Sequence, residues 1–211
     1  MNTHGPLNLI ITGVGGQGNV LLAQLIGKAL VNSEYYVTIG ETFGPAQRGG
    51  AVMSHLRISQ HMEYSPLIPE GQANIILGLE PVETLRVLGQ FGNPRVAVIT
   101  NTRPVYPIAV TGGEARYPDL EKMKELVFDL SAKVWFLNAT EMAFDMGMPI
   151  LANIIMAGAL LGTGTVPLRQ EQFLPVLINS FSKDKQEPNL QAFKRGFDLT
   201  RNDTNGQLTN S

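Results

Sequence analysis

Residues Asn8–Val20 read NLIITGVGGQGNV, an apolar segment that runs directly into a glycine-rich turn. The continuous apolar stretch Leu7–Thr12 is typical of a strand that is covered on both faces of a sheet. Gln17–Asn32 follows with apolar residues at helical spacing, and Tyr35–Ile39 is rich in β-branched and aromatic residues. The order strand, glycine turn, helix, strand predicts a βαβ unit.

The next segment departs from a plain doubly wound fold. Thr42–Gly50 contains three glycines and a proline where such a fold normally enters a helix. In Ala51–Ser59 the residues Val52, Leu56 and Ile58 alternate with polar or larger neighbours, which is the period of a strand. A strand that returns from its neighbour through a loop is usually antiparallel. The sequence therefore predicts a Rossmann-like, three-layer α/β domain with a mixed β-sheet.

The rest of the chain continues this alternation. We expect strands at 74–79, 95–100 and 133–137, helices at 81–91, 119–130, 170–181 and 189–200, and strand fragments with loop at 101–117. The apolar run 148–162 is interrupted by Asn153 and predicts a buried core helix. Residues 1–200 are expected to form one domain, and the polar, aperiodic residues 201–211 a disordered tail.

Composition excludes several classes of function. The net charge of −2 lacks the basic footprint of a nucleic-acid-binding protein. No cysteine is present, so this chain holds no disulfide, iron–sulfur cluster or cysteine nucleophile, and its three histidines lack the spacing of a metal site. No signal peptide is visible, and no apolar run reaches the roughly 20 residues that span a membrane. We expect a cytoplasmic protein.

The first glycine motif has the form of a phosphate-binding turn. Its members are Gly13, Gly15, Gly16, Gln17 and Gly18. The glycines would permit a tight turn, approach of a phosphate to the backbone, and close packing of the helix that follows. Glu41 lies about where a ribose-binding acid is expected, roughly 20 residues on, which favours a dinucleotide site. The amide of Gln17 either faces a ligand or partner, or caps its own loop; both readings remain open.

A second glycine motif, GPAQRGG, occupies residues 44–50. Its candidate ligand-facing residues are Gln47, Arg48, Gly49 and Gly50. Arg48 is a planar, permanently charged donor that can hold a carboxylate or phosphate through two parallel hydrogen bonds. Arg57, on the following strand, is expected to add positive charge nearby. The alternative is that Arg48 ties the loop to the domain through backbone carbonyls.

Four separated motifs carry a family resemblance: GVGGQG at the first turn, GPAQRGGAVMSHLRIS at 44–59, GLEPVETLR at 78–86, and the pattern from Asn189 to Gly196. Together they resemble the gamma-type chain of 2-oxoacid:ferredoxin oxidoreductases over Leu7–Gly196. The combination of QRGG with SHLR is most similar to the beta subunit of indolepyruvate oxidoreductases. Glu80 and Glu83, within the third motif, fall at the start of a predicted helix, where carboxylates favour the positive end of the helix dipole.

The resemblance implies a specific role. Enzymes of this family oxidatively decarboxylate a 2-oxoacid on thiamine diphosphate, pass electrons through iron–sulfur clusters to ferredoxin, and release an acyl-CoA. This chain has neither cysteine nor the GDG…N run typical of thiamine diphosphate–magnesium sites. The resemblance therefore implies an accessory subunit, inactive alone, whose partner carries thiamine diphosphate, Mg and the clusters.

In that reading both glycine loops face the partner's active site, and Arg48 or Arg57 attracts CoA phosphates or the 2-oxoacid carboxylate. One alternative is a stand-alone dinucleotide-binding protein that uses the first glycine turn and Glu41. Another is a purely structural subunit whose loops only pack against a neighbour.

Overall fold

The computed structural model describes residues 5–44 and 50–203. Its strands are β1 (Leu7–Val14), β2 (Tyr36–Phe43), β3 (Ala51–Ser59), β4 (Ile75–Gly78), β5 (Ala97–Asn101) and β6 (Lys133–Leu137). Its helices are α1 (Asn19–Val31), α2 (Pro81–Phe91), α3 (Ile108–Thr111), α4 (Leu120–Asp129), α5 (Ala139–Asp145), the 3₁₀ helix η1 (Pro149–Leu151), α6 (Ala152–Gly162), α7 (Gln170–Asn179) and α8 (Lys183–Thr200). The chain thus begins with the predicted strand, glycine turn and helix.

The six strands form one mixed sheet in the order β2-β3-β1-β4-β5-β6. β1, β4, β5 and β6 run parallel, whereas β3 is antiparallel to both of its neighbours, β1 and β2. In the β1–β3 pairing Val14 lies opposite Ala51, and Asn8 lies opposite Arg57. The predicted antiparallel strand at 51–59 and the mixed sheet are therefore confirmed. A short connection from β2 can only reach a neighbour that runs the other way.

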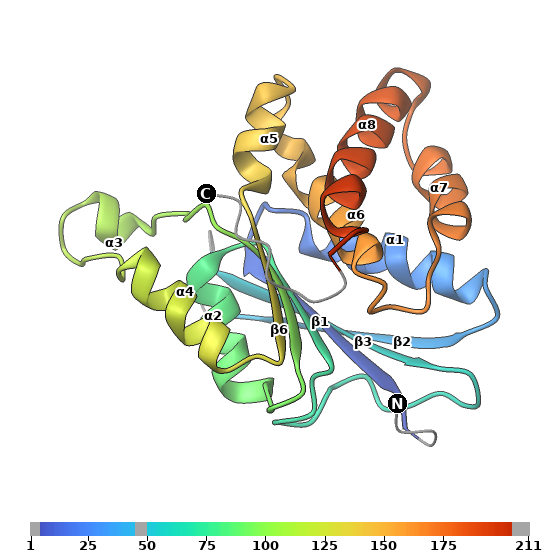
Figure 1. The fold of residues 1–211 in the computed structure, drawn as a ribbon, viewed down its shortest axis with the longest axis horizontal. Helices are drawn as coiled ribbons and strands as arrows, with labels where there is room; N and C mark the ends of the chain where they lie inside the picture. The colour runs from blue at the N-terminus through green and yellow to red at the C-terminus, as the bar shows by residue number, and fades with distance from the viewer. Residues whose placement is uncertain (1–4, 45–49, 204–211) are drawn as a thin grey trace.

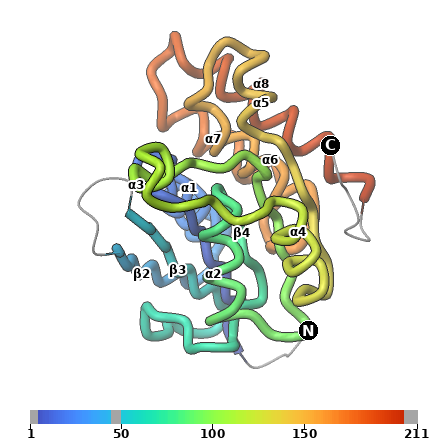
Figure 2. The backbone as a smooth tube through the Cα atoms, turned by 90° about the vertical axis from the view of Figure 1, so that its left-hand side faces the viewer, coloured from blue at the N-terminus to red at the C-terminus, as the bar shows by residue number. Residues whose placement is uncertain are grey.

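Helices cover both faces of the sheet, as Figure 1 shows. One face packs against α1, α6, α7 and α8, and the other packs against α2 and α4. Alternate residues of β1 serve the two cores: Leu9 and Ile11 belong to the first, and Ile10 to the second. The turned view in Figure 2 shows the same separation, with α5 and α8 near the top and α2 below. The three-layer α/β prediction is confirmed.

Helix α6 is the predicted core helix, and its residues from Asn153 to Leu161 are all buried. It packs against α8 through two glycines. A Cβ on Gly158 or on Gly196 would collide with backbone atoms of the opposite helix, so both positions need glycine for this close approach. No helix in the described part of the chain is long and apolar enough to cross a membrane.

Three segments differ from the sequence-based expectation. Residues 102–117 contain no strand fragment and instead include the short helix α3. Helix α5 was not expected, although Asn138 caps it by accepting a hydrogen bond from the backbone N–H of Glu141, a recognisable start signal. Helix α8 begins at Lys183 rather than at residue 189, so Pro188 lies inside it. The helix tolerates this proline because a single proline removes only one intrahelical hydrogen bond, and other contacts hold the helix.

The chain continues from α8 to Asp203, whose backbone carbonyl accepts a hydrogen bond of 3.1 Å from Trp135 Nε1. Residues 204–211, most of the predicted tail, lie outside the described residues.

Candidate functional site

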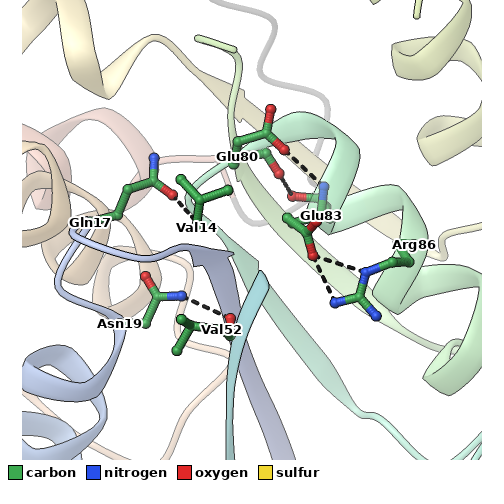
Figure 3. Close-up of polar contacts among 8 residues, drawn as sticks. Val14, Gln17, Asn19, Val52, Glu80, Glu83 and Arg86 are labelled. Atoms are coloured by element: carbon green, nitrogen blue, oxygen red, sulfur yellow. Dashed lines mark hydrogen bonds and ion pairs between the residues drawn. The ribbon is translucent and has the colours of Figure 1, made fainter. Parts of the chain in front are cut away.

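The side chain of Gln17 closes the first glycine turn. Its Oε1 accepts a hydrogen bond of 2.9 Å from the backbone N–H of Val14, as Figure 3 shows. Its Nε2 donates a hydrogen bond of 2.9 Å to the carbonyl of Leu79. A Cβ on Gly13 would collide with Gln17 Oε1, so Gly13 makes room for this amide. Of the two readings of Gln17, the structure shows the one in which it caps its own loop.

Gly16 and Gly18 adopt left-handed backbone conformations, with φ of +94° and +82°. Gly18 is the N-cap of α1, and no side chain caps this helix. Leu22 N–H donates to the carbonyl of Gly18, but in the described part of the chain the N–H groups of residues 19–21 have no acceptor. The end of a 13-residue helix therefore presents free donors and a positive dipole at the turn.

The two glycine motifs are joined by hydrogen bonds. Gly15 N–H donates to the carbonyl of Gly50 at 2.9 Å, and Asn19 Nδ2 donates to the carbonyl of Val52 at 2.9 Å, as Figure 3 shows for the latter pair. A groove of about 450 Å³ lies between the motifs and is lined on one side by Gly15 and Gly16 and on the other by Phe43, Gly44 and Gly50. Gln47, Arg48 and Gly49 lie outside the described residues.

Arg57 is not part of this arrangement. It lies six positions along β3 from Ala51, which corresponds to about 20 Å, at the amino end of β1. Its guanidinium donates to Asn8 Oδ1 at 3.2 Å and to Ser65 Oγ at 3.1 Å, and it stacks over the ring of Tyr64. The expected proximity of Arg57 to the second glycine motif is wrong, because the register of β3 carries it to the other end of the sheet.

Glu41 does not occupy the place of a ribose-binding acid. The antiparallel strand β3 lies between β2 and β1, so Glu41 is opposite Ser54 rather than beside the glycine turn. Two strand spacings, about 10 Å, separate it from β1. In addition, the carbonyl of Gly50 occupies the N–H of Gly15, which a bound pyrophosphate would otherwise approach. The geometry does not favour the dinucleotide alternative.

A chain of polar contacts fixes the carboxyl ends of the parallel strands. The carbonyl of Leu79 accepts from Gln17 Nε2 and, at 3.1 Å, from Asn101 Nδ2. Asn101 Nδ2 also donates to Thr140 Oγ1 at 2.9 Å. These bonds connect the ends of β1, β4 and β5 to the start of α5. Polar residues directly after apolar strands were the only signal of this network in the sequence.

Glu80 is buried at the same end, with 2% of its surface exposed. It caps α2 by accepting from the N–H of Glu83 at 2.9 Å, and it also accepts from the hydroxyl of Tyr117 and from the N–H of Val105. Burial raises the pKa of Glu80, while these hydrogen bonds oppose the increase. Burial and the bond to Glu80 raise the pKa of Tyr117, so its hydroxyl remains a donor. Glu80 thus holds the segment between β5 and α4.

Glu83 lies on the first turn of α2, as expected for a carboxylate at a helix start, and forms an ion pair with Arg86 (Figure 3). Among the described residues, no group of three or more His, Cys, Asp and Glu side chains is arranged to hold a metal ion.

Residues 8–199 match the family described as pyruvate ferredoxin/flavodoxin oxidoreductase. The chain belongs to this family. It is 37% identical to the indolepyruvate oxidoreductase subunit IorB of Thermococcus kodakarensis over 90% of this chain and 93% of that one. It is 27% identical to the 2-oxoglutarate synthase subunit KorC of Methanothermobacter thermautotrophicus over 90% of this chain and 92% of the relative.

A solved structure shares the fold. The 2-oxoglutarate:ferredoxin oxidoreductase of Magnetococcus marinus, with 2-oxoglutarate, coenzyme A and succinyl-CoA bound, superimposes with a TM-score of 0.71 at 18% identity. The match covers 98% of this chain and 33% of the larger one. The fold of this family member is thus repeated as one part of a longer polypeptide.

Proposed function

We propose that the chain is the accessory subunit of a cytoplasmic 2-oxoacid:ferredoxin oxidoreductase that converts an aryl pyruvate such as indolepyruvate to an acyl-CoA. The observation that carries the proposal is the 37% identity to an indolepyruvate oxidoreductase subunit over nearly the full length of both chains. The lower identity of 27% to a 2-oxoglutarate synthase subunit of similar coverage favours the indolepyruvate branch.

Thiamine diphosphate, Mg and the iron–sulfur clusters belong to the partner subunit in this proposal, and ferredoxin is reached through the complex. The chain has no cysteine to ligate a cluster, and its described residues offer no metal-binding group of acids and histidines. Its own residues therefore do not fit these cofactors. The isolated chain is expected to be inactive.

The carboxyl end of the sheet is the side proposed to face the partner. It carries the groove between the glycine motifs, with Gln47, Arg48 and Gly49 in the segment that joins Gly44 to Gly50. Two isoleucines in the segments after β5 and β6, Ile108 and Ile150, are 83% and 80% exposed. Exposed large apolar side chains in the segments that follow the carboxyl ends of strands favour a protein partner at this end.

The first test is anaerobic affinity purification of the full-length chain from its native host. We expect a second protein to accompany it in stoichiometric amounts with thiamine diphosphate and iron, and the complex to oxidise indolepyruvate faster than 2-oxoglutarate or pyruvate. A chain that purifies alone with a bound nucleotide would overturn the proposal in favour of the dinucleotide alternative.

The role of Arg48 is tested in the same complex, with Arg57 as a matched control. Arg48→Ala is expected to raise the KM for CoA or for the 2-oxoacid about tenfold, since one hydrogen bond to a charged group is lost. Arg57→Ala is expected to leave both KM values unchanged, because its guanidinium is bound at the other end of the sheet. If Arg48→Ala prevents assembly without affecting turnover of what assembles, the loop is structural.

A further inference from the structure

Strand β2 forms one edge of the sheet and pairs on one side only, with β3. Gly44 N–H donates to the carbonyl of Ala51 at 2.7 Å, so these two residues form a hydrogen-bonded pair of the antiparallel ladder. Such pairs alternate along a ladder, so the even-numbered residues of β2 bond to β3. The odd-numbered residues direct their backbone N–H and C=O groups outward; these are Val37, Ile39, Glu41 and Phe43.

This edge is long and regular. β2 has eight residues, contains no proline or lysine, and keeps an unbroken register with β3 from Tyr36 to Phe43. Within the described residues no hydrogen bond uses its outward backbone groups. Tyr36 and Phe43, at the two ends of the strand, are 47% and 66% exposed. An edge without a bulge, a proline or a lysine is a template for pairing with a further strand.

The edge is complementary to itself. When a second β2 strand runs antiparallel with Gly40 opposite Gly40, every outward-directed residue meets another one. Val37 then lies opposite Phe43 of the second copy, Ile39 lies opposite Glu41, and the two-fold symmetry repeats both pairs. Each pair exchanges two hydrogen bonds, so the edge would gain about eight. A shift of the register by two residues in either direction loses one of the pairs.

Helix α1 carries a matching pattern above the strand. Its Gly27 packs against Ile39 and Val37 of β2. The exposed residues of α1 recur at helical spacing and form one stripe, which consists of Leu21, Gln24, Lys28 and Val31. Two such stripes that run antiparallel place Leu21 against Val31 and Gln24 against Lys28. The stripe is therefore also complementary to itself, with apolar ends and a polar centre.

Lys28 and Glu41 complete the match in charge. Neither side chain belongs to an ion pair among the described residues. In the register above, Glu41 of one copy lies opposite Ile39 of the other, which packs against Gly27, the neighbour of Lys28. Each Glu41 carboxylate is thus brought beside the Lys28 ammonium of the other copy, and the symmetry makes this contact twice.

We propose that the β2 edge binds a second copy of this chain, so that two six-stranded sheets join into one across a two-fold axis at Gly40. The inference goes beyond the proposed function and does not depend on it, because it uses only β2 and α1.

The direct test exploits the absence of cysteine from the chain. In the proposed register Thr38 lies opposite Thr42 of the second copy, whereas within one strand the two residues are about 13 Å apart, too far for a disulfide. The full-length double variant Thr38→Cys/Thr42→Cys is therefore expected to form a covalent dimer on mild oxidation at low protein concentration, as measured by mass spectrometry. Thr38→Cys and Thr42→Cys alone are the matched controls and should remain uncross-linked. No covalent dimer in the double variant, or equal cross-linking in the single variants, would overturn the proposal.

Charge reversal tests the same interface without cysteine. Sedimentation of the full-length wild-type chain is expected to show a dimer. Glu41→Lys should raise its dissociation constant about tenfold, since two pairs of opposite charge become pairs of like charge, and Lys28→Glu in the same chain should restore it. Glu125→Lys, at an exposed position of α4, is the matched control and should leave the dimer unchanged.

Two outcomes of the sedimentation experiment contradict a second copy at this edge. A dimer that Glu41→Lys does not weaken would place the contact on another surface. A wild-type chain that is monomeric at every concentration, and that loses a co-purifying subunit in Glu41→Lys, would assign the edge to that subunit.

Discussion

The two ends of the sheet are built from the same strands, but they differ in whether their polar groups have hydrogen-bond partners within the chain. At the amino end, Asn8 donates hydrogen bonds to Asn74 Oδ1 and to the carbonyl of Gln72, and Arg57 donates to Asn8 and Ser65. At the carboxyl end, the N–H groups of residues 19–21 at the start of α1 have no acceptor in the described residues, and the buried Oδ1 of Asn19 has no donor there.

The difference separates two uses of polar residues. Groups that are paired within the chain stabilise the fold, whereas converging groups that are left unpaired are available to a ligand or a partner. Gln17 shows that both kinds coexist at the carboxyl end, since its amide is used entirely to close the turn.

Glu80 offers the test with the largest expected effect. Its carboxylate is fully paired within the chain, although it lies at the carboxyl end of the sheet, where other polar groups are unpaired. Glu80→Ala is expected to lower the free energy of unfolding by about 3 kcal/mol, since three donors lose their acceptor in a buried place. Urea unfolding measures the change. Glu80→Gln retains one acceptor oxygen and should lose less. Wild-type stability in Glu80→Ala would show that these contacts do not hold the segment between β5 and α4.

Arg57→Ala tests the amino end and is expected to have a smaller effect, about 1–2 kcal/mol, from the loss of hydrogen bonds to Asn8 and Ser65. Thermal unfolding measures it. The KM of the assembled complex for CoA and for the 2-oxoacid should be unaffected, since Arg57 and the groove between the glycine motifs lie at opposite ends of the sheet. A higher KM in this variant would mean that the two ends are coupled and that the division is false.

The sequence predicted those parts of the fold that depend on local pattern. The apolar run of β1, the glycine turn and the alternation in residues 51–59 each specify their own conformation, and together they predicted the mixed sheet. The position of Arg57 was not predictable, because it depends on the register between β3 and β1, which is set by tertiary pairing.

The contact between Gly18 at the start of α1 and Asn153 of α6 shows the same limit more clearly. Gly18 was expected to serve close packing of the helix on the strand, and Asn153 was only an interruption in an apolar run. Their relation exists only once α6 is packed beside α1, since the two residues lie far apart in the sequence. A single polar residue in a core helix was the one available signal.

His55 lies in the middle of β3, between the two ends of the sheet, and gives the test with the smallest expected effect. It is 1% exposed, its Nδ1 accepts a hydrogen bond of 3.3 Å from the N–H of Ile68, and burial lowers its pKa. In the unfolded chain this histidine has a pKa of about 6.5. As the pH falls, its imidazole is therefore protonated at a higher pH in the unfolded chain than in the folded chain.

The stability that neutral His55 provides is complete above about pH 6.5 and is lost as the pH falls toward the folded-state value. His55→Gln keeps an acceptor for Ile68 N–H but does not titrate, so the fall in unfolding free energy between pH 7 and about pH 5 should be shallower, by about 1.4 kcal/mol for each unit of pKa difference. His61→Gln, at an exposed position, controls for the removal of one imidazole. An equal slope in His55→Gln and the wild type would mean that the buried imidazole is protonated as easily in the folded chain as in the unfolded one, and that the middle of the sheet is open to water.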